Sequence, residues 1–325
     1  MNEFSFITTL NSILWNDYTL YALLLTGVIF TVWSGFSQYY ALTHGVKVIR
    51  GDFDKASDPG AITHFQALST ALSATVGLGN IGGVALAISL GGPGAVFWMW
   101  VVGFLGMAIK LTEVSLAMIH RDTSDRENPN GGPMWVVEKN LKNKSSIIVF
   151  FGKLIAGVFC AALILNTITA GNMFQAWNVA NLTQSYFGVP TVVTGCILAI
   201  LVGAVIIGGI KRIGAVASKL VPFMLILYVL ACVFVLSVNL GQIPSMLALI
   251  VTSAFEPLEA SNAFIGGTAG YAFMYGMQRA LFSNEAGQGS SAIAHSAAKT
   301  DEPIREGVVA GLEPFIDTIV VCTMS

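Results

Sequence analysis

The sequence predicts an all-α membrane protein, a polytopic helix bundle with an inverted five-helix repeat and two discontinuous helices. Hydrophobic residues make up 54% of the 325 residues and charged residues 10%, with a mean hydropathy of +0.73, whereas soluble domains are about 25% charged. Eight apolar segments reach the roughly 20 residues that are needed to cross a bilayer. Two of them, residues 71–88 and 264–298, are interrupted midway by glycines and polar residues.

The eight predicted spans cover most of the chain. We place them at residues 19–42, 62–90, 95–118, 147–176, 190–210, 213–239, 262–297 and 306–325. The apolar stretch 246–254 is too short to cross a bilayer, so we expect it at the membrane interface. The last run is still apolar at Ser325 and has no basic or aromatic flank. We therefore expect a C-terminally truncated, N-terminal fragment, with three more spans after Ser325 in the full protein.

Lysine and arginine residues occupy alternate connections between the predicted spans. The connections 91–94, 178–189 and 241–261 contain neither residue type. Loops rich in lysine and arginine stay in the cytoplasm, so we predict a multi-pass protein of the cell membrane with its N-terminus outside. The basic residues that follow spans one, three, five and seven are Lys47, Arg50, Lys55, Arg121, Arg126, Lys139, Lys142, Lys144, Lys211, Arg212, Lys219, Lys299 and Arg305.

This orientation makes the two interrupted segments an inverted pair. The first runs from inside to outside, and the second, five spans later, runs from outside to inside. Interrupted helices at corresponding positions of inverted halves indicate a binding site near the bilayer midplane. We therefore divide a single transmembrane domain, residues 1–325, into three parts. Residues 1–60 hold an extra span and a cytoplasmic loop, residues 61–240 form the first five-span repeat, and residues 241–325 begin the inverted second repeat.

The first interruption lies within residues 73–83, which read SATVGLGNIGG. Backbone groups freed at this depth must line a cavity and bind a ligand, which indicates a transporter. N–H groups at the start of the outer half-helix attract a carboxylate, and carbonyls at the end of the inner half-helix suit a small cation. The alternative is that the glycines only allow close packing of helices. That alternative does not explain why Thr75 and Asn80 lie beside them. The G-x-G-x-x-G match at 77–82 lies in a helical span, which excludes a dinucleotide site.

The second interruption, within residues 276–287, contains Arg279, Asn284 and Glu285. Ionisable residues inside spans are functional hypotheses by default, and here they are Lys110, Glu113, Arg279, Glu285, Glu313 and Asp317. The side chains at the second interruption could brace the unwound backbone, form a cytoplasmic gate or neutralise one another, and we favour a gate or brace over substrate contact. Lys110 and Glu113 are three residues apart on one helical face, so we expect them to form a structural pair.

Other polar side chains carry weaker signals. Four of them recur every three residues in the fourth span, and such a stripe either faces the bundle interior or only bonds neighbouring helices. We expect solvated or interfacial roles for the histidines, which fall at span ends or in loops without ligand spacing. The stripe comprises Asn166, Thr169, Asn172 and Gln175, and the histidines are His44, His64, His120 and His295.

Several sequence blocks resemble the alanine or glycine:cation symporter family, also called the sodium:alanine symporters. The block at 91–100, GGPGAVFWMW, with Gly-Met-Ala at 106–108, is similar to the family signature. Further similar blocks are FQALS at 65–69, GGPM at 131–134, GNMFQ at 171–175, SNEAG at 283–287 and LEPFID at 312–317. The resemblance covers nearly the whole chain from the second span onward. Members of this family are similar in fold to the sodium-coupled leucine transporters, whose unwound first core helix is matched by VGLGN at 76–80.

The resemblance implies roles for individual residues. The N–H groups of Leu78 and Gly79, next to Gly77, would receive the substrate carboxylate. The Thr75 carbonyl and the Asn80 side chain would suit a nearby sodium ion. The carbonyls of Ser73 and Val76 would contribute to a second sodium site, whose other ligands would come from a span after Ser325. In the second interrupted helix, the candidates for the side-chain pocket are Phe273, Tyr275, Gly276 and Met277.

We therefore expect a sodium-coupled symporter, not an enzyme, that imports alanine or glycine by alternating access. Its partners would be a small neutral amino acid, sodium and membrane lipid. We expect no cofactor beyond the coupling ion and no nucleic acid, and the sequence identifies no protein partner. The alternatives are proton coupling, a passive channel, a membrane-embedded enzyme and a transporter-derived amino-acid sensor.

Overall fold

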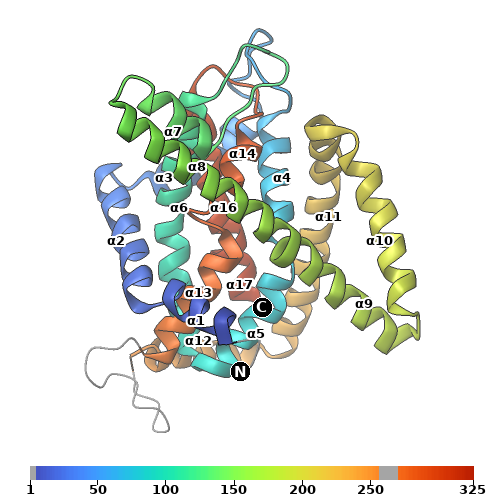
Figure 1. Ribbon diagram of the computed structural model, residues 1–325. Helices are drawn as coiled ribbons and strands as arrows, with labels where there is room; N and C mark the ends of the chain where they lie inside the picture. The colour runs from blue at the N-terminus through green and yellow to red at the C-terminus, as the bar shows by residue number, and fades with distance from the viewer. Residues whose placement is uncertain (1–4, 256–269) are drawn as a thin grey trace.

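The computed structural model describes residues 5–255 and 270–325, which form a bundle of helices (Figure 1). The N-terminal half contains α1 (Ser5–Leu14), α2 (Asp17–Trp33), α3 (Ser37–Ile49), α4 (His64–Thr75), α5 (Leu78–Gly91), α6 (Gly94–His120), α7 (Pro133–Leu141) and α8 (Ser146–Asn166). A π-helical turn (Thr167–Met173) then joins α8 to α9 (Phe174–Phe187). The remaining helices are α10 (Thr191–Ile206), α11 (Gly209–Val238), α12 (Ile243–Ser253), α13 (Tyr271–Asn284), α14 (Ser290–His295), α15 (Pro303–Ala310), α16 (Leu312–Pro314) and α17 (Cys322–Met324), with a 3-10 turn at Leu240–Gln242 and a π-helical turn at Phe315–Val321.

Long apolar helices confirm a membrane helix bundle. Within the described residues, four segments are long and apolar enough to cross a membrane, namely Gly94–His120, Ser146–Phe187, Gly209–Val238 and Pro303–Met324. Two bent pairs, α2 with α3 and α4 with α5, qualify if each pair counts as one span. The predicted fifth span corresponds to the shorter helix α10, and α12 corresponds to the predicted interfacial piece. Residues 262–269 of the predicted seventh span lie outside the described residues.

The predicted first span, 19–42, is not one straight helix. The chain bends by 71° between α2 and α3, because Gly35 and Phe36 adopt left-handed conformations with φ of 64° and 60°. The buried Gln38 fixes the bend, since its Nε2 donates to Thr31 Oγ1 at 2.8 Å and to the carbonyl of Phe104 on α6 at 3.2 Å. The Gly35 position is therefore the sequence signal for this bend, which hydropathy alone did not reveal.

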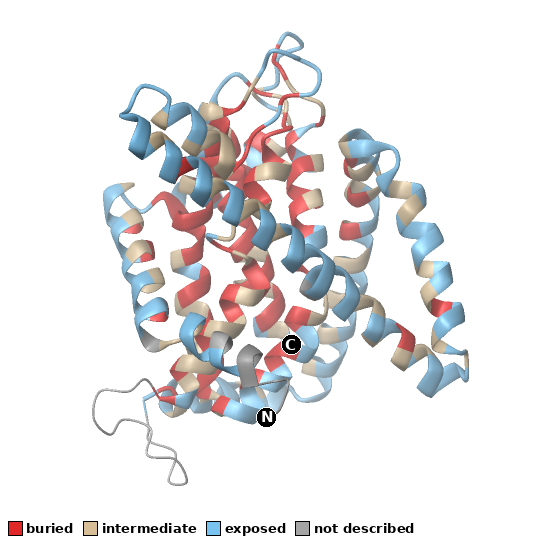
Figure 2. Ribbon diagram, viewed as in Figure 1, coloured by how far each residue is buried: buried red, intermediate tan, exposed pale blue. Residues whose placement is uncertain are grey.

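Buried residues concentrate on α6, α13 and α15 at the centre of the bundle, whereas α8 to α11 expose apolar side chains (Figure 2). Two-thirds of the apolar window of Gly94–His120 is buried (67%), against 6% for Gly209–Val238. Apolar surface on the outside of a bundle is what a lipid environment accepts. The centre, made of α4 to α6 and α13 to α16, therefore positions the candidate site.

The basic connections meet at one end of the bundle, which we call the basic end (Figure 1). The N–H of Gly60 donates to the carbonyl of Arg126 at 2.8 Å, and the N–H of Thr300 donates to the carbonyl of Pro59 at 3.1 Å. Lys211 Nζ lies 3.5 Å from Glu127 Oε2. Connections that the charge pattern assigned to one side of the membrane are thus close together in space.

The two interrupted segments run antiparallel and touch along their length. At one end, a Cβ added to Gly91 of α5 would lie 2.9 Å from the Tyr271 carbonyl at the start of α13. At the basic end, Ile62 forms an isolated β-bridge with Ala298. Midway, a Cβ on Gly79 would lie 3.7 Å from Ser283 Oγ. The opposite directions that were predicted for the two segments are therefore observed, and their central parts face each other.

Candidate functional site

The first interruption separates α4 from α5 by two residues and a bend of 41°. Val76 leaves the helical conformation with φ of −81° and ψ of 110°, and Gly77 is extended. Asn80 is fully buried, and its Oδ1 accepts the N–H of Gly77 at 2.8 Å. This side chain acts as a capping group, because it satisfies one of the N–H groups that a helix start leaves free.

The interruption leaves other backbone groups without a partner. Within the described residues, no hydrogen bond joins the N–H groups of Leu78 and Gly79 to an acceptor. The carbonyls of Ser73, Thr75 and Val76 likewise accept none there. Backbone groups without partners are costly away from water. The donors and acceptors that the sequence assigned to ligands are therefore the ones that this fold leaves available.

A cavity of about 50 Å³ lies between the two interruptions. Both interrupted segments line it, together with the helix that contains the π-helical turn. A mixture of carbonyl, amide, carboxylate and aromatic groups therefore surrounds the space. The lining residues are Ala74, Thr75, Gly79, Asn166, Gly171, Gln175, Phe282, Glu285 and Gln288.

The polar stripe of the fourth span is only partly turned toward this cavity. Asn166 and Gln175 line it, but Asn172 is exposed and Thr169 Oγ1 donates to the carbonyl of Leu165 on its own helix at 2.8 Å. The π-helical turn between them explains the difference, because it changes the angular spacing of side chains relative to a regular helix.

The second interruption lies later in the chain than predicted. Residues 276–284 remain helical in α13, and the break extends over residues 285–289. Glu285 ends α13 in a left-handed conformation with φ of 53°. The buried Asn284 braces this turn, since its Oδ1 accepts the N–H of Ala286 at 3.0 Å and its Nδ2 donates to Thr318 Oγ1 at 3.1 Å. The Ser283–Gly287 block thus marks the break, whereas Gly276 does not.

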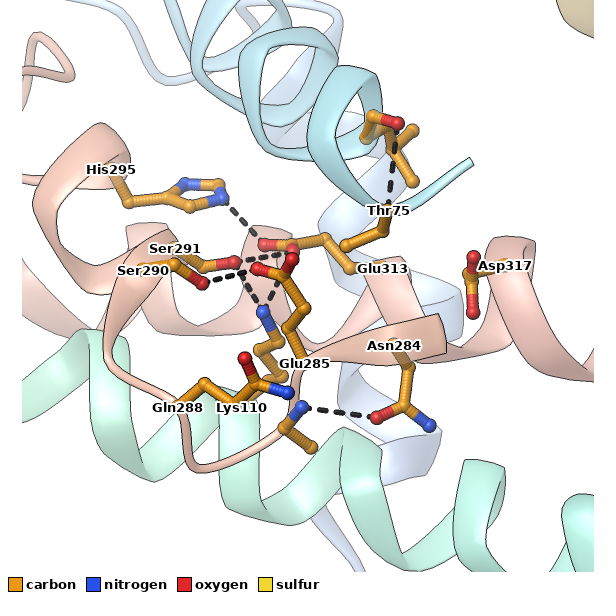
Figure 3. Close-up of polar contacts among 12 residues, drawn as sticks. Thr75, Lys110, Asn284, Glu285, Gln288, Ser290, Ser291, His295, Glu313 and Asp317 are labelled. Carbon is orange, nitrogen blue, oxygen red and sulfur yellow. Dashed lines mark hydrogen bonds and ion pairs between the residues drawn. The ribbon is translucent and has the colours of Figure 1, made fainter. Parts of the chain in front are cut away.

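Arg279 lies inside α13 and reaches across to α5. Its Nε lies 3.4 Å from the carbonyl of Gly79, and its guanidinium carbon lies 4.7 Å from the centre of the Phe282 ring. Gly83 leaves the space for this contact, because a Cβ there would lie 1.7 Å from Arg279 Nε. Glu285 does not neutralise Arg279 among the ion pairs of the described residues, and it accepts a hydrogen bond from Ser290 Oγ instead (Figure 3).

Four residues predicted to shape the substrate pocket lie outside this cavity. Phe273 and Met277 are buried in an apolar cluster, where the Phe273 ring packs against Trp98 with centroids 4.8 Å apart. Gly276 contacts α6, since a Cβ there would lie 2.4 Å from the Ala95 carbonyl, and Tyr275 stacks on Tyr271. Because α13 stays helical past these positions, its contribution to the cavity comes one to two turns later, from Phe282.

A buried carboxylate beside Asn80 was not assigned a role by the sequence. Asp317 is fully buried, and its carboxylate accepts from Asn80 Nδ2 at 2.6 Å, Ser283 Oγ at 2.9 Å and Thr318 Oγ1 at 2.9 Å. No lysine, arginine or histidine of the described residues forms an ion pair with it. The signal available in the sequence was an aspartate inside an apolar span, next to a threonine.

Two predictions about buried charge were wrong. Lys110 pairs with Glu313 Oε2 at 3.1 Å instead of with Glu113, whose Oε2 accepts the N–H of Gly287 at 2.9 Å. His64 and His295 are buried, not solvated, and both contact carboxylates. The missed signal was the spacing of Glu306 and Glu313, which are seven residues apart and therefore share one helical face.

Comparisons with known proteins place the chain among membrane carriers. The profile of the sodium:alanine symporter family matches residues 2–325. The sodium/alanine symporter AgcS of Methanococcus maripaludis is 43% identical over 325 residues, which are 100% of this chain and 70% of that protein. An uncharacterized transporter of Haemophilus influenzae is 39% identical over 99% of this chain and 68% of its own length. A putative sodium/proton-dependent alanine carrier of Bacillus subtilis, YrbD, is 37% identical, and the chain spans 62% of it.

Proposed function

Because this chain belongs to the sodium:alanine symporter family, we propose that it imports a small neutral amino acid, alanine or glycine, together with sodium. It would do so by alternating access in the cell membrane, with the N-terminus outside. The observation that carries this proposal is the set of backbone groups at the first interruption that have no hydrogen-bond partner among the described residues, beside a cavity lined by both interruptions.

The amino acid would bind through its charged ends. Its carboxylate would accept the N–H groups of Leu78 and Gly79, where the helix dipole of α5 also favours negative charge. Its ammonium group could donate to the side-chain oxygen of Gln175, which lies 3.7 Å from a Cβ built on Gly77. The cavity of about 50 Å³ supports a small substrate, because a buried water needs about 10–15 Å³ and only a few such groups would fit.

Sodium would bind to oxygen atoms around the same interruption. We propose the Thr75 carbonyl for one ion, and the Ser73 and Val76 carbonyls for a second. Asn80 would act near the first ion, although its Oδ1 caps Gly77 in this conformation. The carboxylate of Asp317 and the hydroxyl of Ser283 lie next to Asn80, and the hydroxyl of Thr318 donates to Asp317. A buried carboxylate without a cationic partner would offset the loss of hydration of a sodium ion.

Coupling would arise because both ligands use one interruption. Sodium held by the carbonyls that end α4 would fix the geometry in which the N–H groups that begin α5 face the cavity. Each ligand would then raise the affinity for the other by the same factor. The two antiparallel interruptions would provide the boundary across which the cavity opens to one side of the membrane at a time.

Uptake by proteoliposomes tests this function. The full-length protein should accumulate labelled alanine when an inward sodium gradient is imposed, and Gln175→Ala should lower uptake. Gln184→Ala, an exposed glutamine on the same helix α9, serves as the matched control and should leave uptake unchanged. Equal uptake with and without the sodium gradient would contradict sodium coupling, and uptake driven by a proton gradient alone would establish the proton-coupled alternative. Alanine binding without flux would indicate a sensor.

A further inference from the structure

Five buried titratable side chains form a continuous chain of contacts, which we call the buried ladder. His64 is 2% exposed and the other four are fully buried. The ladder runs from the basic end of the bundle toward the second interruption, and its members come from α4, α6, α14 and the span Pro303–Met324. In order, the members are His64 of α4, Glu306 of α15, His295 of α14, Glu313 of α16 and Lys110 of α6.

Each member of the ladder contacts the next. Both His64 Nδ1 and His295 Nδ1 contact the Glu306 carboxylate, one on each oxygen. His295 Nε2 lies 2.7 Å from Glu313 Oε1, and Lys110 Nζ lies 3.1 Å from Glu313 Oε2. Figure 3 shows Glu313 with His295, Ser291 and Lys110 around it. At the outer end, His64 Nε2 lies 3.5 Å from Asp54, whose side chain is 43% exposed.

The contacts of His295 require one proton more than a neutral histidine carries. Both of its ring nitrogens face carboxylate oxygens, and a carboxylate is only an acceptor while it is ionised. A neutral imidazole has one N–H group and could donate to one of the two carboxylates only. The second contact therefore needs an additional proton, either on the ring or on a glutamate.

The net charge of the ladder also indicates one additional proton. Two carboxylates and one ammonium group leave one negative charge when both histidines are neutral, and a single added proton cancels it. Charges removed from water must be paired. Arg121 lies near Glu306, but its guanidinium donates to the backbone carbonyls of Pro59, Ser296, Ala298 and Thr300.

Other charged groups that face the ladder also favour added positive charge. Glu113 and Glu285 interact with Lys110, so carboxylates outnumber the cation at the inner end. Most of the additional charges around the ladder are acidic. Among the residues that the structure describes, the charged groups that act on the ladder or on the adjacent Arg121 are Asp54, Asp58, Glu113, Arg121, Glu285, Asp301 and Asp317.

We propose that the buried ladder is a proton-binding site that exchanges with water at the basic end through Asp54 and His64. Chains of acidic and histidine side chains inside a membrane are typical of proton pathways. The bound proton completes the hydrogen bonds that connect α4, α6, α14 and α15. These helices include the basic-end parts of both interrupted segments. When the proton is lost, the neutral imidazole of His295 can donate a hydrogen bond to only one of Glu306 and Glu313. The other carboxylate is then left without a donor from His295, which favours separation of the helices that the ladder connects.

This site does not depend on the identity of the amino acid or the coupling ion. It makes the conformational equilibrium at the basic end sensitive to the pH on that side alone. A proton on the ladder stabilises the packed arrangement, and a more alkaline solution at the basic end favours opening there. The ladder would then adjust the rate of transport to the pH of one compartment.

Nitrogen NMR of the full-length, unmutated protein in lipid nanodiscs, with labelled histidine, tests proton binding directly. We expect His295 to show two protonated ring nitrogens at about pH 7.5, where histidine in water is mostly neutral, or one protonated nitrogen opposite a protonated glutamate carboxyl. His44→Gln is the matched control, because His44 stacks on Phe53 outside the ladder and its loss should leave the His295 signals unchanged. A neutral His295 between two ionised glutamates across the titration would overturn the proposal.

A second measurement uses proteoliposomes in which the pH at the basic end is varied at constant pH on the other side. For one titrating site, the ratio of protonated to unprotonated protein changes about tenfold per pH unit, so uptake by the unmutated protein should vary strongly with that pH. His295→Gln and Glu306→Gln should flatten this dependence while His44→Gln retains it. An identical pH profile in the unmutated protein and in folded His295→Gln would contradict the proposal.

Discussion

Arg279 provides the sharpest test of how the α13 side of the cavity is positioned, because Phe282, which its guanidinium contacts, lines the cavity. Its guanidinium lies on the Phe282 ring and beside the Gly79 carbonyl. It can lie there because Gly83 has no side chain, and the Cβ of Gly83→Ala would lie 1.7 Å from Arg279 Nε. The adjacent Gly82 has no atom within 4 Å of the same position, so Gly82→Ala is a matched control in the same helix.

The magnitude follows from the contact that is lost. A cation on an aromatic ring contributes about 0.5–2 kcal/mol, and the hydrogen bond at 3.4 Å is too long to add much. Both variants gain similarly from replacing glycine by alanine in a helix, about 1 kcal/mol, so this gain cancels in the comparison. We therefore expect alanine affinity to fall about two- to thirty-fold in Gly83→Ala relative to Gly82→Ala.

Equilibrium binding of labelled alanine to both purified variants, in the presence of sodium, measures this difference. Thermal stability of each variant is recorded in parallel, so that a loss of binding through unfolding is recognised. If both folded variants bind alanine equally well, Arg279 does not brace the interruption and the proposed role is wrong.

Two further predictions concern the buried carboxylate and the contact between α13 and α6. Asp317→Asn removes the negative charge next to Asn80, so we expect at least about a tenfold loss of sodium affinity, and an unchanged sodium dependence of alanine binding would rule out this role. Gly276→Ala would place a Cβ 2.4 Å from the Ala95 carbonyl, which should lower stability by about 1–3 kcal/mol in thermal unfolding. Gly241→Ala, whose Cβ would meet no atom within 4 Å, is its control, and equal stability of the two would contradict the packing described.

The first interruption and the basic end could be predicted from the sequence, because both depend on local composition. Glycines and polar residues in an apolar run located the first interruption within residues 73–83, and the structure breaks there at Val76 and Gly77, because the unwinding is encoded by Val76, Gly77 and Asn80 themselves. Charge placement predicted which connections meet at the basic end, and the contacts of Gly60, Thr300 and Lys211 agree. The bend at Gly35 was missed because apolar residues lie on both sides of it, within the predicted span 19–42.

The details of the site depended on tertiary contacts that spacing alone does not reveal. The family resemblance implies that Phe273 and Met277 shape the pocket, but α13 stays helical as far as Asn284, and the residue of α13 that lines the cavity is Phe282. His295 stands at the end of a predicted span, where solvation was expected. Only the fold brings it between two glutamates that are 11 and 18 residues away in the chain.

We propose above all that backbone groups freed between α4 and α5 hold the amino acid. An experimental structure of the full-length protein with alanine and sodium bound tests it most directly. We expect the alanine carboxylate within hydrogen-bonding distance of the N–H groups of Leu78 and Gly79, with a sodium ion on the carbonyls that end α4. Alanine bound elsewhere, or a continuous and fully hydrogen-bonded helix through Val76 and Gly77, would contradict the account.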